Sequence, residues 1–159
     1  MTLAYVALGS NLGDSRRQVL DAMDALDALP ATRVLQRSPL YRTPPWGVIE
    51  QPPFINAVVS LDTGLLPEPL LDALLRIETA AGRVRAGRNG PRTLDLDLLH
   101  MDGVTRQDER LVLPHPRMTE RAFVLLPLCA IAPTFQLPGR GTVRALLEDL
   151  DASGCERLS

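Results

Sequence analysis

The apolar patterns along the chain follow the order strand–helix–strand–strand–helix–strand, which predicts an α+β fold. That order is typical of the ferredoxin-like arrangement, an antiparallel sheet with helices packed on one face. Helical patterns near the end of the sequence predict extra C-terminal helices beyond this unit. Because 159 residues without repeats or a linker suit one domain, we expect residues 1–159 to form a single domain.

The first two elements are a strand and an amphipathic helix. Residues 3–8 form a short apolar run, which predicts a strand that enters a turn at Gly9. A helix should begin at Asp14 or Ser15, either of which can cap it, and should end before Pro30. Its apolar positions recur at helical spacing, at Val19, Leu20, Met23 and Leu26.

The later elements follow from alternation, helical spacing and turn residues. We expect, in chain order, an extended segment over 32–41 with a break at Ser38-Pro39, a strand over 54–63, a helix from Pro67 capped by Gly82, a strand over 93–99, a turn at Asp102-Gly103, a helix capped by Thr119 and running to Ala130, and a short helix over 142–150.

Composition narrows the class of protein. A net charge of -2 and a pI near 5.7 argue against nucleic acid as the main partner. No export signal and no apolar run of membrane-spanning length is visible, so we expect a cytoplasmic protein. All 17 basic residues are arginine, so phosphate groups would have to meet arginine, backbone N–H groups or a metal.

Two carboxylates carry the strongest local signal. On a strand, Asp95 and Asp97 share one face, while the leucines at 94, 96 and 98 face the core. Side-by-side carboxylates repel, and a cation between them removes that repulsion. Hard oxygen ligands suit Mg²⁺, and a carboxylate pair can bridge two ions. The alternative is an amphipathic strand with a solvated polar face.

Four arginines stand just upstream of this pair, in a glycine-punctuated loop, at Arg83, Arg85, Arg88 and Arg92. Guanidinium groups beside metal-binding carboxylates could together bind a triphosphate, because the paired N–H donors of arginine match the oxygens of a phosphate group. Such a loop could also close over the site and exclude water. The alternative is a set of surface ion pairs.

An aromatic and an amide share the other candidate face. Phe54 and Asn56 lie on the same side of the strand over 54–63, where they could stack on a flat heterocycle and bond its edge. The alternative is a structural role, in which Phe54 packs under a helix and Asn56 caps a loop. His115, held between two prolines before a helix, suits either a phosphate contact or a structural role. For His100 we expect a surface role.

These segments together resemble the family of 6-hydroxymethyl-7,8-dihydropterin pyrophosphokinases over nearly the whole chain. The block Gly90-Pro91-Arg92-Thr93-Leu94-Asp95-Leu96-Asp97 is highly specific. The other matching blocks stand in the same order as in the family, at residues 7–14, 41–45, 51–57, 76–78, 82–85, 113–118 and 121–123.

The resemblance implies a magnesium-dependent diphosphotransferase of tetrahydrofolate biosynthesis. The acceptor hydroxyl attacks the β-phosphorus of ATP, AMP leaves, and the pyrophosphate ester of the pterin forms. By similarity, two Mg²⁺ ions are held by Asp95 and Asp97, and the transferring group is stabilised by Arg83 and Arg92. No protein nucleophile is needed, because catalysis is positioning and charge stabilisation.

The resemblance also implies the two substrate subsites. The pterin side comprises Thr43, Pro45, Trp46, Phe54, Asn56 and Phe123. The ATP side comprises Glu78, Arg85, Arg88, Arg92, Leu98, Arg110, His115 and Arg121. The expected partners are therefore small molecules, with no nucleic acid, no membrane and no second subunit.

A non-catalytic module on the same fold is the rival interpretation, either an RNA-binding domain or a small-molecule sensor. RNA binding would favour a basic surface with aromatic residues on the central strands, which the acidic pI and the Asp95/Asp97 pair oppose. A sensor would not need the arginine loop beside the carboxylates.

Overall fold

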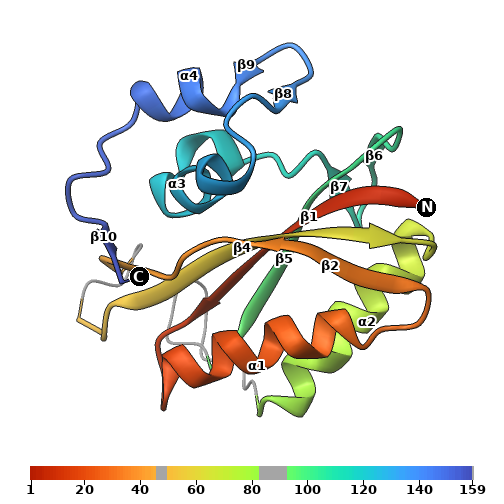
Figure 1. Ribbon diagram of the computed structural model, residues 1–159, viewed down its shortest axis with the longest axis horizontal. Helices are drawn as coiled ribbons and strands as arrows, with labels where there is room; N and C mark the ends of the chain where they lie inside the picture. The colour runs from red at the N-terminus through yellow and green to blue at the C-terminus, as the bar shows by residue number, and fades with distance from the viewer. Residues whose placement is uncertain (46–49, 83–92, 159) are drawn as a thin grey trace.

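The computed structural model describes residues 1–45, 50–82 and 93–158 and shows a sheet with helices on both sides (Figure 1). The principal sheet is six-stranded and antiparallel, in the order β10-β3-β4-β1-β5 with β2 also pairing β4. Its long strands are β1 (Thr2–Ser10), β4 (Phe54–Thr63) and β5 (Asp95–Met101). Its shorter strands are β2 (Thr32–Arg37), β3 (Tyr41–Thr43) and β10 (Glu156–Arg157).

The predicted α+β class is therefore confirmed. The two helices of the predicted strand–helix–strand–strand–helix–strand unit pack on one face as expected, and the extra C-terminal helices lie on the other face. Helices α1 (Ser15–Asp27) and α2 (Pro67–Ala80) pack on one face, whereas α3 (Ala122–Ile131) and α4 (Val143–Glu148) cover the other (Figure 1). Both faces of β4 are consequently buried, with Val59 in one core cluster and Val58 in the other.

Local chemistry explains where the helices begin and end. The Asp14 side chain accepts a hydrogen bond from the backbone N–H of Arg17 at 3.2 Å and caps α1. Pro67 occupies the first turn of α2, and Gly82, at φ +79°, follows its end as a left-handed cap. Of the four apolar positions at helical spacing in α1, Val19, Met23 and Leu26 are buried, whereas Leu20 is 38% exposed.

The predicted cap of the third helix is also wrong. A 3₁₀ turn, η1 (Met118–Glu120), contains Thr119, and α3 begins only after Arg121. The Thr119 hydroxyl accepts a hydrogen bond from Arg140 Nη1 at 3.2 Å instead of capping the helix. Thr142 caps the short helix α4, because its hydroxyl accepts a hydrogen bond from the backbone N–H of Ala145.

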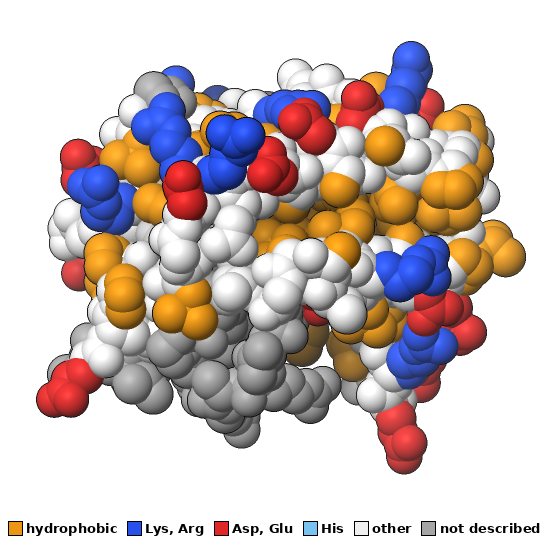
Figure 2. Space-filling view, turned by 90° about the horizontal axis from the view of Figure 1, so that it is seen from below, with side chains coloured by type: hydrophobic (Ala, Val, Ile, Leu, Met, Phe, Trp, Pro, Cys, Tyr) orange, Lys and Arg blue, Asp and Glu red, His pale blue; other side chains and the backbone are white. Residues whose placement is uncertain are grey.

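Two small hairpins complete the architecture, β6 (Arg106–Gln107) with β7 (Val112–Leu113) and β8 (Gln136–Leu137) with β9 (Gly141–Thr142). In the described ranges no helix is both long and apolar enough to cross a membrane. Seen from the side of α1 and α2, the coloured surface mixes acidic, basic and apolar side chains (Figure 2).

Candidate active site

A pocket with about 690 Å³ of space not filled by atoms opens on the face of the sheet that α3 covers. Its lining comes from strands β1, β3, β4 and β5 and from the start of α3. The residues are Ala7, Leu8, Gly9, Thr43, Pro44, Phe54, Asn56, Asp95, Asp97, Arg121, Phe123 and Val124. Segments from both halves of the chain thus meet in one hollow.

The carboxylate pair lies at one side of this pocket. Asp95 and Asp97 stand on β5 opposite Gly9 and Ala7 of β1, and both line the pocket. The leucines that alternate with the two aspartates point the other way, into the main core, as predicted. They are Leu94, Leu96 and Leu98. Strand alternation therefore presents both carboxylates to the same space.

A buried glutamate lies beneath the same strand. Glu78 of α2 is only 4% exposed, and its Oε2 accepts a hydrogen bond from the backbone N–H of Leu96 at 2.7 Å. Among the described strands, β5 is paired with β1 on one edge only. On the other edge the Glu78 carboxylate accepts from a buried backbone N–H that would otherwise have no hydrogen-bond partner among the described residues. Glu78 therefore fastens the backbone between the two aspartates.

The amide of Asn56 is held by two neighbours. Its Nδ2 donates to the buried hydroxyl of Thr43 at 2.6 Å. Its Oδ1 lies over Gly9, where an added Cβ would come within 2.7 Å of that oxygen. Gly9 thus lies inside β1 rather than in a turn, and it is glycine because the amide occupies the side-chain space.

Arg121 brings a cation into the pocket. Its guanidinium carbon lies 5.5 Å from the centroid of the Phe123 ring, a cation–π distance. Burial lowers the pKa of Arg121, while Asp97 and Asp95 oppose that effect. Within the described part of the chain, the buried Nε of Arg121 has no hydrogen-bond partner. A buried donor of this kind calls for a ligand acceptor.

His115 lies close to Arg121 and Asp95. Burial lowers the pKa of His115, the charges of Arg121 and Arg117 lower it further, and Asp95 opposes them. The Nδ1 atom accepts a hydrogen bond from the backbone N–H of Arg117 at 3.2 Å, which places the proton of the neutral ring on Nε2. The lowered pKa favours the neutral form of the ring, and the hydrogen bond fixes its orientation.

His100 differs from the expected surface residue. It lies within β5, is 8% exposed, and its ring centroid is 4.7 Å from that of Phe135. Its Nε2 bonds Asp102 Oδ1 at 2.7 Å. The prediction of a surface role was wrong because the strand runs two residues past its predicted end and places the ring against Tyr5 and Phe135.

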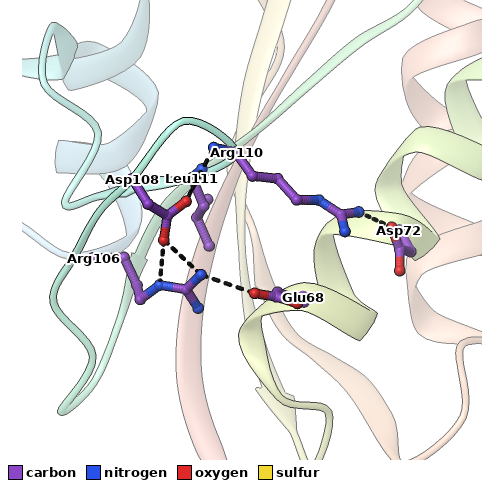
Figure 3. Close-up of polar contacts among 6 residues, drawn as sticks. All are labelled: Glu68, Asp72, Arg106, Asp108, Arg110 and Leu111. Atoms are coloured by element: carbon purple, nitrogen blue, oxygen red, sulfur yellow. Dashed lines mark hydrogen bonds and ion pairs between the residues drawn. The ribbon is translucent and has the colours of Figure 1, made fainter.

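Arg110 lies outside the pocket lining and pairs with α2. Figure 3 shows its guanidinium directed at Asp72, with which it forms a hydrogen-bonded ion pair. Beside it, Arg106 bridges Glu68 at 2.9 Å and Asp108 at 2.8 Å. The loop between β6 and β7 is thereby attached to the side of α2.

The structure brings together seven of the predicted site residues, namely Thr43, Phe54, Asn56, Asp95, Asp97, Arg121 and Phe123. Pro45 does not line the pocket, and its neighbour Pro44 does. The Leu98 side chain is buried in the main core, so this residue could meet a ligand only through its backbone. Five predicted residues fall outside the described ranges, at Trp46, Arg83, Arg85, Arg88 and Arg92.

Sequence reasoning missed several lining residues, above all Gly9 and Pro44. A glycine beside an apolar strand run was an available signal for close packing, and it was interpreted as a turn instead. Among the described residues, no group of three or more His, Cys, Asp or Glu side chains is placed to hold a metal. Two carboxylates still fit Mg²⁺, which is commonly held by one or two carboxylates together with substrate phosphates.

The fold and the pocket define an α+β domain whose pocket is lined by aromatic rings and acidic side chains. The profile of the family described as 7,8-dihydro-6-hydroxymethylpterin-pyrophosphokinase (HPPK) matches residues 5–133. The chain therefore belongs to this family and is a pyrophosphokinase of folate biosynthesis, with ATP as its co-substrate.

Curated relatives agree over almost the whole length. A 2-amino-4-hydroxy-6-hydroxymethyldihydropteridine pyrophosphokinase of Methylorubrum extorquens is 52% identical over 99% of this chain and 99% of its own. The protein of the same name from Pseudomonas aeruginosa is 49% identical, over 97% of this chain and 95% of its own.

A solved structure shares the fold. The HPPK-DHPS of Plasmodium falciparum superposes with a TM-score of 0.73 at 14% identity, over 99% of this chain and 47% of that one. The present chain thus spans about half the length of that solved chain, and at this identity the likeness concerns the fold alone.

Proposed function

We propose that the pocket binds the reduced pterin alcohol and that the Asp95/Asp97 side receives the phosphates of ATP. The observation that carries this proposal is the meeting of a carboxylate pair, two aromatic rings and a half-buried arginine in one pocket. Phe54 and Phe123 offer stacking surfaces for a flat heterocycle. Asn56, held by Thr43 and Gly9, is the polar group for its edge.

Asp95 and Asp97 would hold the magnesium, in the form of two ions. Magnesium supplies charge neutralisation on the phosphate oxygens as the diphosphoryl group moves. The two carboxylates offer hard oxygen ligands from one strand, and nucleotide oxygens and water would complete the coordination. Glu78 would support this arrangement through its bond to Leu96.

The transfer would form a bond from the pterin hydroxyl oxygen to the β-phosphorus of ATP. The bond between that phosphorus and the oxygen shared with the α-phosphate breaks, AMP departs with the electron pair, and the hydroxyl proton is released. The guanidinium of Arg121, whose buried Nε lacks a partner among the described residues, would donate a hydrogen bond to a phosphate oxygen.

The rest of the nucleotide side would be formed by further residues, several of which fall outside the described ranges. Arg83 and Arg92 would stabilise the charge that develops on the transferring group. Contacts around the nucleotide would come from Glu78, Arg85, Arg88, Leu98, Arg110 and His115. The pterin side would be completed by Pro45 and Trp46.

The same proposal covers organisation and location. Residues 1–159 would act as one catalytic domain, as a monomer in the cytoplasm and without nucleic acid or a membrane. The main core links β1, β4, β5, α1 and α2 into one body, and the second cluster ties α3 and α4 to the same sheet, which supports a single domain.

The deciding experiment supplies ATP, Mg²⁺ and 6-hydroxymethyl-7,8-dihydropterin and measures AMP and the pterin pyrophosphate. Both products should appear in equal amounts, and neither should form without metal. ADP as the product would mean transfer of a single phosphoryl group and would contradict the proposal. Binding of the pterin with no turnover of ATP would favour the sensor interpretation.

A further inference from the structure

The chain returns near its end to the edge of the sheet that carries the pocket wall (Figure 1). Strand β10 pairs antiparallel with β3, with Glu156 opposite Arg42 and Arg157 opposite Tyr41. The backbone N–H of Leu158 then donates to the carbonyl of Leu40 at 2.8 Å. The outer edge of β3 is thereby covered by backbone hydrogen bonding.

Two side-chain features hold the same segment in place. Gly154 lies against Pro44, where an added Cβ would be 3.2 Å from Pro44 Cγ. Leu158 is half-buried and packs against the main core. The ion pair of Arg42 with Glu156, at 3.2 Å, is largely exposed and adds little by itself. Backbone pairing and close packing therefore carry the attachment.

The tail holds residues 40–42, which lead directly into the pocket lining, and Pro44, which belongs to that lining. Strand β3 ends at Thr43, whose hydroxyl accepts the hydrogen bond from Asn56, and Pro44 lines the pocket directly. A three-residue edge strand paired on one side only would be weakly fixed. We infer that residues 154–158 are a positioning element. They would hold Thr43 and Pro44, the part of the pocket lining that we call the pterin wall, in place without touching the ligand.

The strand order makes the expected effect selective. Strand β10 lies at one edge of the sheet and β5, with its two aspartates, at the other, with β3, β4 and β1 between them. Loosening β3 should therefore displace the pterin wall and leave the carboxylates in place. This inference rests on the proposed assignment of the pterin to this pocket.

A matched pair of variants at one position tests the inference. Leu158→Pro removes the N–H that reaches Leu40, whereas Leu158→Ala keeps it and loses more side-chain packing. We expect Leu158→Pro to raise the KM and the Kd for the pterin alcohol by roughly three- to tenfold, the scale of one lost hydrogen bond. The KM for ATP and the kcat at saturating pterin should stay within about twofold of the wild type in both variants. Leu158→Ala should raise the KM and the Kd for the pterin less than Leu158→Pro does, because it keeps the backbone hydrogen bond.

A second variant covers the case in which Leu158→Pro does not fold. Gly154→Val should push Pro44 outward and weaken the pterin in the same selective way. Glu148→Ala, an exposed change on α4 distant from β3, should have no effect. Kd values from calorimetry with the pterin alone give a readout independent of turnover.

Different results overturn different claims. If both variants bind the pterin like the wild type, residues 154–158 do not position the pocket. Equal losses for ATP and pterin would indicate general destabilisation and would also overturn the inference. If the wild type itself fails to bind the pterin or to release AMP, the proposed function fails instead.

Discussion

The carboxylate of Glu78 accepts the backbone N–H of Leu96, the residue between Asp95 and Asp97, at 2.7 Å. A side chain from helix α2 thus occupies the edge of β5 where a neighbouring strand would otherwise pair. Because Glu78 is buried, this bond couples the packing of α2 to the placement of both aspartates.

Glu78→Ala should destabilise the fold. The change leaves the Leu96 N–H buried without its acceptor, which costs about 1–3 kcal/mol of unfolding free energy. Glu78→Gln keeps an oxygen in place and should lose less. Urea unfolding of the three proteins measures the difference, and an alanine variant as stable as the wild type would show that the bond contributes nothing.

Gly9→Ala should weaken pterin binding. The new methyl group would meet Asn56 Oδ1 at 2.7 Å and displace the amide, at a cost of about 1–3 kcal/mol in pterin affinity. Asn56→Ala should cost a similar amount, and the double variant should be far from additive because both act on one group. Calorimetric titration of the pterin into all three variants checks this, and additive losses would disprove the shared mechanism.

Asp97→Asn should lower turnover by orders of magnitude. It keeps the shape of the side chain but removes the charge that would hold the metal beside the nucleotide. Pterin affinity should hardly change. Asp102→Asn, the same substitution just beyond β5 and outside the pocket lining, serves as the control. Near-native activity of Asp97→Asn at ordinary Mg²⁺ concentration would refute the metal assignment.

The pKa of His115 should lie below its ordinary value of about 6.5 in the metal-free protein, since burial and Arg121 both lower it. The unfolded chain then takes up the proton first, so stability is lost as the pH falls below about 6.5 and levels off beneath the folded pKa. His115→Gln should remove that contribution.

NMR titration is practical because the chain contains 2 histidines. Urea unfolding of wild type and His115→Gln at about pH 8 and pH 5 gives the linked stability change. A His115 midpoint at or above about 6.5 would contradict the assigned environment.

Phe54→Ala and Phe123→Ala should each weaken the pterin by roughly 1–3 kcal/mol, the scale of a lost stacking surface. ATP affinity should stay about the same. Phe135→Ala, which removes a ring packed on Tyr5 and His100, should reduce stability without this selectivity. Separate titrations of the two ligands decide the matter, and equal losses for both would point to a damaged core.

Much of the fold could be predicted from local pattern. The strand over 54–63, the helix capped at Asp14 and the helix ended by Gly82 all stand where their residues place them. Alternation along β5 was enough to put Asp95 and Asp97 on one face and their leucine neighbours in the core. These features depend on contacts close in sequence, so the residues themselves carry them.

Other features depend on contacts between distant segments, and only the tertiary structure decided them. Gly9 and Asn56 face each other across two strands, Glu78 meets Leu96 across a helix and a strand, and the tail returns to Leu40. Helices α3 and α4 cover the second face because β4 is apolar on both sides, which buries His100 against expectation. The sequence by itself determined the residues of the site, and long-range packing determined which neighbours hold them.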